Sequence, residues 1–569
     1  MPMPRQPIQP RALLAALLLC AAAGSVHAIG GAESMDRPSA RPLDIPGYES
    51  NQPPEGLKAP PAAKAPTPEE EGLDRSRDLP LRRVEFEGGS VFPEEELRAL
   101  ARPYEGRKVS VSDLEELRQK LTQLYVGQGY INSGAVIPED GYRDGVLRVR
   151  LVEGKLDEVR VQGQERLREG YIQNRLQGDP GQPLNLHELQ DRFQLLLSDP
   201  LIERMNGRLL PGAGPGSSVL DVAVVRAQPY GLSVSGDNHR PPSIGAEAFG
   251  ASGWVRNLAG FGDLLEFTFN TSSGSERYYG GLTVPITDSG TLAYFHFDEG
   301  DSRVVEAPAN KLDIRSLVHN LEGGLSHPVI HTLDQRLILG LSLATRENQT
   351  SLLGQPFSFV PGEPSGRNQA TVWRIYQDFS QRWERQAVAF RSTFSVGMDA
   401  FGATPETNPR YPSSEFFAWL GQAQYGYLAT EDGGQLVLRG MAQFSDSPLL
   451  PLEKVAVGGV GTVRGYRENH LVRDQGYALS LEFRYPLLGG NDPAARHRLS
   501  LIPFMDYGEA WNLNQRSEAL HSVGIGFNWE YKPVYAELYW GYKLIKPRPD
   551  PHTNLQDDGI HFLVRLDLL

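Results

Sequence analysis

The second part of the chain alternates apolar and polar side chains with a period of two, which is typical of β-strands with one apolar face. In one such segment Leu479, Leu481 and Phe483 share a face, while Ser480 and Glu482 lie on the opposite face. The same alternation recurs at 337–343, 436–444 and 562–568. Apolar-out and polar-in alternation predicts a membrane β-barrel, and the alternative is a soluble sandwich with one solvated face.

The length of this region sets the size of the predicted barrel. At roughly 20 residues per strand and connection, the stretch 229–569 holds about 16 antiparallel strands. Aromatic residues recur at segment ends, as at Tyr278, Tyr279 and Trp529, where a membrane barrel carries its interfacial girdles. The predicted fold class is therefore a membrane all-β barrel, preceded by smaller domains.

Two short α+β units precede the barrel. Residues 80–154 read as strand, helix, helix, strand, strand, with Ser112 and Glu115 predicted to form a capping box at the second helix. The same order recurs over 155–228, where Asn185 is predicted to cap a helix. By pattern alone each unit is a small α+β domain.

The N-terminus has the layout of an export signal. A basic start, an apolar run over 12–23 and a small-residue site at Ala28 predict a secretory signal peptide over 1–28. A lipoprotein signal around Cys20 is the alternative. Because Cys20 is the only cysteine, cleavage after Ala28 leaves a chain without disulfides, cysteine metal sites or thiol catalysis.

Residues 29–79 differ in composition from the rest of the chain. Proline pairs at 53–54 and 60–61 alternate with Ala, Lys and Glu, and aromatic residues are nearly absent. Such a stretch buries too little surface to offset its ordering entropy, so it is predicted to be a flexible or semi-extended linker. No amphipathic helical pattern that would indicate a plug helix stands out in it, and whether one exists is left open.

Charge and motif content exclude several function classes. The formal net charge of -14 argues against a nucleic-acid partner. His327 and His331 are four residues apart, but Pro328 prevents a helix and a strand separates them by roughly 13 Å. No catalytic residue, cofactor or metal site is predicted.

A glycine-rich segment around 458–466 carries one cation, Arg464. Arginine keeps its proton in proteins, so inside a barrel it requires a counter-ion. Asp506 lies on the strand face opposite Met505, which makes its carboxylate lumenal if Met505 faces lipid. Glu482 is lumenal by the same alternation and is a second candidate partner.

Two motifs carry a resemblance to a known family. The string Val463, Arg464, Gly465, Tyr466, followed by an acidic-glycine strand ending at Gly508, resembles the two-partner secretion transporters of the haemolysin secretion/activation family. A second string resembles the family's turn between early strands, with matching residues Asn257, Leu258, Gly260, Gly262 and Asp263. The chain departs from the family at Leu569, where relatives usually end on an aromatic residue.

The resemblance implies an architecture and a function. Residues 80–154 and 155–228 would be periplasmic POTRA domains, and a loop over 453–475 would fold into the lumen with Arg464 against Asp506, Glu482 and the Gly508 strand. The protein would sit in the outer membrane as a monomer, inserted by the barrel-assembly machinery, without cofactors. It would export a dedicated exoprotein recognised through that partner's N-terminal secretion domain. An outer-membrane insertase and a passive porin are the alternatives, and the nature of the cargo is left open.

Overall fold

The computed structural model divides the chain into two compact units. One comprises the described residues up to Pro229 together with the four residues 259–262, and the other contains the remainder from Tyr230 onward. The structure describes residues 57–58, 79–179, 181–490, 492, 495–548 and 552–569. The predicted signal peptide and nearly all of the predicted linker lie outside these ranges. Within them, no helix is both long and apolar enough to cross a membrane.

The first half of the N-terminal unit is a small sheet with two helices. β3 (Arg83–Glu87) runs parallel to β7 (Val146–Val152), which pairs antiparallel with β5 (Gly134–Val136). α3 (Glu94–Ala101) and α4 (Val111–Gly127) follow β3 along the chain. α4 buries Leu114, Leu117, Leu121 and Tyr125 in the core that it shares with Leu147 and Val149 of β7. The remaining elements are β2 (Leu79–Leu81), η2 (Arg102–Tyr104), β4 (Arg107–Val109) and β6 (Tyr142–Arg143).

The predicted capping box of α4 is wrong by two residues. The N-cap is Ser110, whose hydroxyl accepts a hydrogen bond from the Asp113 backbone N–H at 3.1 Å. The Ser110 N–H donates to the Asp113 carboxylate at 2.7 Å, which completes the box. Ser112 is already helical, and Glu115 forms a salt bridge with Arg118 instead. Two overlapping Ser-x-x-acid strings fit this helix start, and the preceding backbone decides between them.

This cap makes the N-terminal unit sensitive to acid. A hydrogen bond from Arg107, followed by hydrogen bonds from Ser110, lowers the pKa of Asp113 from 3.8 to about 2. Because the folded-state pKa lies below the unfolded one, this contribution is present above about pH 3.8 and is lost as pH falls toward 2. We expect Ser110→Ala to lower the free energy of unfolding of the fragment 79–229 by about 1 kcal/mol at pH 7.

Denaturant titrations of that fragment at several pH values check both effects. Between about pH 4 and 2, which covers the unfolded-state and folded-state pKa values of Asp113, the Asp113→Asn variant should lose less stability than the wild type. An unchanged acid profile in Asp113→Asn, or full stability in Ser110→Ala, contradicts the assignment of the cap.

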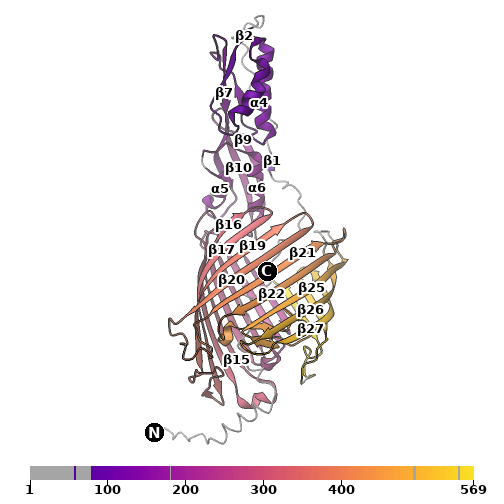
Figure 1. Cartoon of the computed structure of the whole chain (residues 1–569). Coiled ribbons are helices and arrows are strands. Elements are labelled where there is room, and N and C mark those ends of the chain that lie inside the picture. Colours follow the sequence, from indigo (N-terminus) through magenta and orange to yellow (C-terminus); the bar gives the residue numbers. More distant parts are fainter. Residues whose placement is uncertain (1–56, 59–78, 180, 491, 493–494, 549–551) are drawn as a thin grey trace. The chain divides into compact units, whose positions relative to one another are not determined.

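The second half repeats the same order of elements. β8 (Lys155–Gln162) runs parallel to β10 (Ser217–Arg226), which pairs antiparallel with β9 (Ile202–Pro211). α5 (Glu169–Gln177) and α6 (Leu186–Leu197) supply Ile172, Leu189 and Phe193 to the core. Asn185 caps α6 by accepting from the His187 backbone N–H at 2.9 Å. Figure 1 shows both halves in indigo and purple.

One strand was not expected from the sequence. β1 (Leu57–Lys58), within the predicted linker, pairs in parallel with β9 at Gly207 and Arg208. Strand pairing at a sheet edge uses backbone groups, so a stretch with few apolar side chains can still form it.

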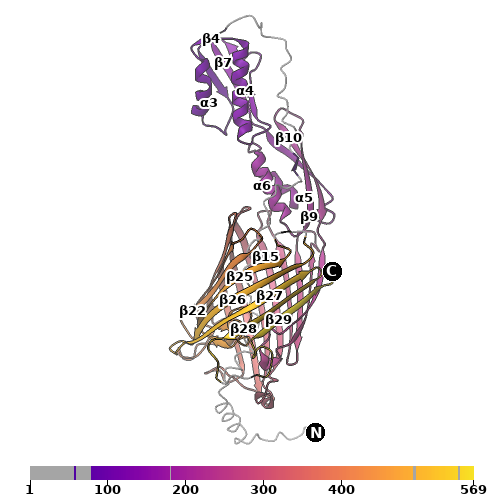
Figure 2. The same cartoon turned by 90° about the vertical axis from the view of Figure 1, so that its right-hand side faces the viewer.

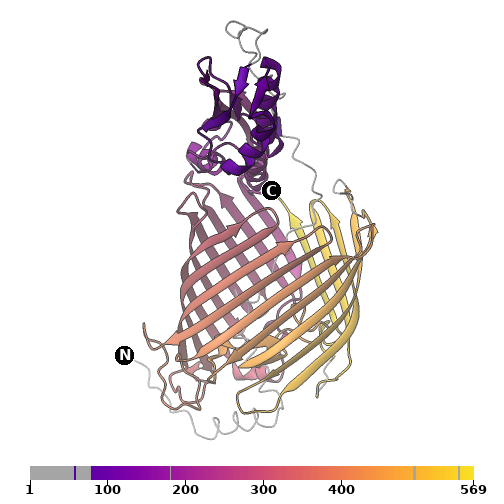
Figure 3. The same ribbon diagram turned by 45° about the horizontal axis from the view of Figure 1, so that its top comes forward.

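The second unit is a closed antiparallel barrel of 16 strands. The barrel closes where β11 pairs with β29, from Ser233 opposite Asp567 to Asp237 opposite Leu563. Figures 1 and 3 show the strands running obliquely around the wall, and Figure 2 shows β25 to β29 side by side. The wall strands are β11 (Tyr230–Asp237), β12 (Ala248–Arg256), β13 (Leu264–Ser272), β14 (Ser275–Pro285), β15 (Leu292–Arg303), β16 (Arg315–His331), β17 (Gln335–Leu352), β19 (Arg367–Arg382), β20 (Gln386–Met398), β21 (Phe417–Leu428), β22 (Gln435–Ser445), β25 (Gln475–Leu488), β26 (Arg498–Trp511), β27 (Glu518–Tyr531), β28 (Val534–Lys543) and β29 (Ile560–Asp567).

Smaller elements lie in the connections of the barrel. They are η3 (Pro242–Ile244), η4 (Ala309–Leu312), β18 (Gln355–Pro356), η5 (Pro451–Glu453), β23 (Val455–Val457) and β24 (Leu471–Arg473).

Side-chain exposure along the wall strands confirms the predicted fold class. On β26, Met505 is 56% exposed on the outer face, whereas the neighbouring Asp506 is 1% exposed on the inner face. On β25, Leu479 and Leu481 are exposed and Glu482 is fully buried. Apolar side chains therefore face outward and polar ones face the lumen, as a membrane barrel requires.

Candidate functional site

The connection from β22 to β25 lies inside the barrel. Within residues 453–475, here called the inward segment, β23 and β24 pair as a short antiparallel ladder. Gly458 and Gly459 follow β23 with φ values of 112° and 99°, a region closed to most other residues. The buried side chains Val457, Val463 and Tyr466 pack against Ala510 and Leu520, which belong to β26 and β27.

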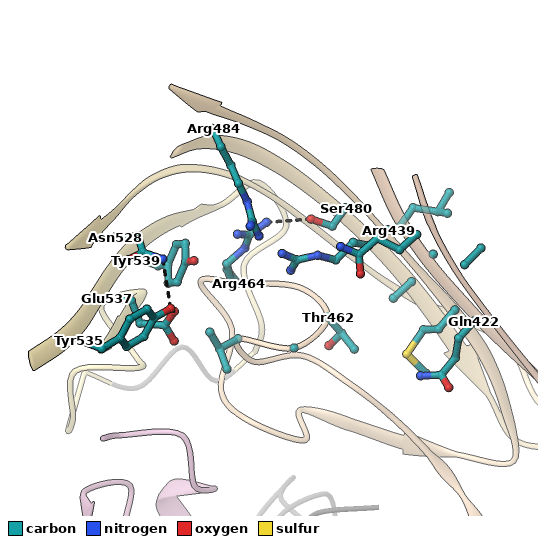
Figure 4. Close-up of a pocket in the computed structure, with 18 residues that line it drawn as sticks. Gln422, Arg439, Thr462, Arg464, Ser480, Arg484, Asn528, Tyr535, Glu537 and Tyr539 are labelled. Carbon is teal, nitrogen blue, oxygen red and sulfur yellow. Dashed lines mark hydrogen bonds between the residues drawn. The ribbon is translucent and has the colours of Figure 1, made fainter. Parts of the chain in front are cut away.

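Arg464 is the centre of the polar contacts and is 3% exposed. Its Nε and Nη2 donate to the two Asp506 carboxylate oxygens at 2.8 and 2.7 Å. Its Nη1 donates to Glu482 Oε1 at 2.6 Å. Nη2 also donates to the Ser480 hydroxyl at 2.8 Å, the contact drawn as a dashed line in Figure 4. The structure thus brings Arg464 together with both carboxylates named from the sequence.

The surroundings of this ion pair are also charged. Glu482 accepts further hydrogen bonds from Arg439 at 3.2 Å and Arg484 at 3.0 Å. The Arg464 guanidinium carbon lies 3.7 Å from the ring centroid of Phe504, a cation–π distance. A buried carboxylate is tolerated only when it is paired and hydrogen-bonded, which is the arrangement found for Glu482.

Glycines allow the inward segment to touch the wall directly. A Cβ on Gly508 would lie 2.5 Å from a Val457 methyl carbon and 2.7 Å from a Val463 methyl carbon. Gly465 has a φ of 92°, and a Cβ on it would lie 2.7 Å from the carbonyl oxygen of Gly541 on β28. Gly541 was missed from the sequence, although a glycine inside a strand pattern often marks such a close approach.

The residues after Arg464 bind other connections of the barrel. The Tyr466 hydroxyl oxygen lies 2.6 Å from the Ile545 carbonyl oxygen and 3.0 Å from that of His521. Arg467 donates to Asp557 at 2.5 Å and to Glu306 at 2.8 Å. Burial alone would raise the pKa of Asp557, but hydrogen bonding from Arg467 and Thr553 lowers it overall. Sequence reasoning missed Arg467 and both of its partners.

A cavity of about 320 Å³, lined by both polar and apolar side chains, lies beside Arg464. Its lining includes the tip of the inward segment and wall residues of β21, β22, β25, β27 and β28. Figure 4 labels Gln422, Arg439, Thr462, Arg484, Tyr535 and Glu537 around it. Within the described ranges no group of three or more His, Cys, Asp and Glu side chains could hold a metal ion. The amide, hydroxyl and guanidinium groups in the lining can donate hydrogen bonds into the cavity.

The early-strand motif forms a separate site. Asn257 and Asp263 flank the turn between β12 and β13, and the Leu258 backbone N–H donates to the Asp263 carboxylate at 2.9 Å. Asn257 has a φ of 59°, and Gly260 and Gly262 have φ values of 90° and 85°. None of the hydrogen bonds of Arg464 described above involves this turn, so the two motifs do not share one cluster.

Comparison with known proteins supports the architecture at two places. The family model described as haemolysin secretion/activation protein ShlB/FhaC/HecB matches residues 216–529, and the ShlB-type POTRA model matches 79–154. The chain belongs to the haemolysin secretion/activation family. The insertase and porin alternatives are thereby set aside.

Relatives and solved structures of this family cover most of the chain. The outer membrane transporter CdiB of Dickeya dadantii is 24% identical over 78% of each chain. The heme/hemopexin transporter protein HuxB of Haemophilus influenzae is 23% identical over 78% of this chain and 79% of that protein. The structure of CdiB from Escherichia coli shares the fold, with a TM-score of 0.67 and 20% identity over 89% of this chain and 93% of that one.

Family membership defines the location and the activity. This transporter resides in the bacterial outer membrane with its POTRA domains in the periplasm. It exports a partner exoprotein by two-partner secretion. Members of the family are transporters rather than enzymes.

Proposed function

We propose that the inward segment closes the lumen at rest and must be rearranged while the partner exoprotein passes. One observation carries this proposal: Arg464 reaches the inner wall, where Asp506, Glu482 and Ser480 all accept its hydrogen bonds. The segment that bears it lies between two wall strands in sequence, so its displacement leaves the strand ladder of the barrel intact.

Buried ion pairs can hold the inward segment in a lumen that must later open. Desolvation offsets much of the attraction within a buried ion pair, so its net contribution to stability is small. Separating the two charged groups is costly if each is left without a hydrogen-bonding partner. Water or polar groups of a passing chain can supply such partners to both the arginine and the carboxylate. Ion pairing therefore fixes the position of the segment while leaving its displacement reversible.

We further infer that the POTRA domains, which we assign to 80–154 and 155–228, capture the partner's N-terminal secretion domain. Extended chains bind exposed sheet edges by adding a strand. β3 and β5 are the outer strands of the first described sheet, and β8 is an outer strand of the second. The monomeric state and insertion by the barrel-assembly machinery belong to the same proposal.

Binding by the isolated periplasmic unit tests this capture. The fragment 79–229 has its own buried cores, so it should fold without the barrel. We expect it to bind the partner's N-terminal secretion domain while that domain is unfolded, and to bind the refolded domain more weakly, because folding removes the free backbone groups. Titration calorimetry measures both affinities, and absence of binding to the unfolded domain contradicts the proposal.

A further inference from the structure

A second set of buried charges holds the base of the inward segment on different strands of the wall. Arg374 on β19 donates through Nη2 to both carboxylate oxygens of Glu453, at 2.8 and 2.9 Å. Arg346 on β17 donates to the Leu452 carbonyl at 3.0 Å and lies 3.6 Å from Glu453 Oε1. The Glu453 side chain is 7% exposed, so this cluster is also buried, although less completely than the one at Arg464.

The polarity of this second cluster is reversed. At Arg464 the inward segment supplies the cation and the wall supplies the carboxylates. At Glu453 the segment supplies the anion and the wall supplies the guanidinium groups. Exchanging the two ends would bring Arg464 against Arg346 and Arg374, and this repulsion favours the observed placement of the segment.

The backbone at the same end is tied to the wall as well. Gln443 on β22 donates through Nε2 to the carbonyl oxygens of Glu453 and Asp474, at 2.9 and 3.2 Å. These two residues lie at opposite ends of the inward segment. The Lys454 ammonium lies 3.0 Å from the Asp474 carboxylate, and this ion pair is a second contact that links the two ends of the segment. Glu453 is the residue at which this base contacts two wall arginines.

We propose that Glu453, held by Arg346 and Arg374, is a second anchor and the positioning residue that determines where the tip bearing Arg464 lies. Loss of its charge frees the base of the segment and leaves two guanidinium groups facing the lumen. The local net charge then rises by one unit, because one of the charges paired at this site is lost. The inference rests on the proposed closure of the lumen by the inward segment.

A single introduced cysteine reports the position of the tip. The chain's only cysteine, Cys20, precedes the predicted cleavage site, and a Cβ on Gly461 would meet no atom within 4 Å. In whole cells carrying Gly461→Cys, we expect Glu453→Gln to accelerate labelling by an external membrane-impermeant maleimide about tenfold, because a buried pair has lost one partner. Glu518→Gln is the matched control, since Glu518 pairs with Arg473 of the same segment but is 52% exposed.

Ion selectivity separates the anchor from a general structural role. In planar bilayers under a KCl gradient, the reversal potential of Glu453→Gln should shift toward anion preference. Adding Arg374→Gln removes one positive charge and so restores the wild-type local charge, and selectivity should return while labelling stays fast. Arg374→Gln alone should also accelerate labelling, which tests the anchor in a variant that retains Glu453.

Unchanged labelling in both Glu453→Gln and Arg374→Gln would overturn the anchor. Failure of the anchor and failure of the proposed closure are distinguishable. Fast labelling in Glu453→Gln combined with normal export in Arg464→Ala supports the anchor and rejects the closure. Unchanged labelling in Glu453→Gln combined with reduced export in Arg464→Ala rejects the anchor and supports the closure.

Discussion

Arg464→Ala should reduce export of the partner exoprotein about tenfold or more while the barrel remains folded. Breaking a buried pair costs about 3–5 kcal/mol, and the inward segment then has no fixed position from which it can be rearranged in an ordered way during passage. The substitution leaves Asp506 and Glu482 facing the lumen without the guanidinium that bridges them. Arg464→Lys should retain partial export, since an ammonium cannot make the bidentate contact to Asp506. Immunoblotting of secreted partner measures export, and heat modifiability on gels reports the folded barrel.

The chain offers a matched control for this experiment. Arg473 belongs to the same inward segment and pairs with the half-exposed Glu518, so Arg473→Ala should secrete near wild-type levels. Asp506→Ala should resemble Arg464→Ala, because it removes the carboxylate that accepts two of the Arg464 side-chain bonds. Wild-type secretion by both Arg464→Ala and Asp506→Ala would show that closure by this pair is not required.

Deleting either 80–154 or 155–228 should abolish export without abolishing assembly of the barrel. Neither range contributes a barrel strand, since the first wall strand, β11, begins at Tyr230. The first deletion removes β3, β5 and β7 and the second removes β8, β9 and β10, so each removes a sheet edge proposed to bind the partner. Heat modifiability and surface labelling establish assembly, and secreted partner is measured in the medium. Normal export by either deletion variant would show that the deleted half is not required to capture the partner.

The period-two pattern determined much of this protein from sequence alone. Alternation around Met505 placed Asp506 on the lumenal face, and alternation around Leu481 did the same for Glu482. Both follow because successive side chains of a strand point to opposite faces, whatever strand lies next to it. Local patterns also located the two α+β units, although they placed the cap of α4 at Ser112 instead of Ser110, since they cannot choose between overlapping caps.

Only the tertiary structure decided which lumenal groups meet. Glu453 and Arg374 are 79 residues apart, and Arg467 and Glu306 are 161 residues apart. Alternation assigns a strand residue such as Arg374 to a face, but its partner depends on the order of strands around the wall and on how far a loop reaches across the lumen. The sequence determines which groups require a partner, because buried charges must be paired, and the closed barrel determines which partner each one has.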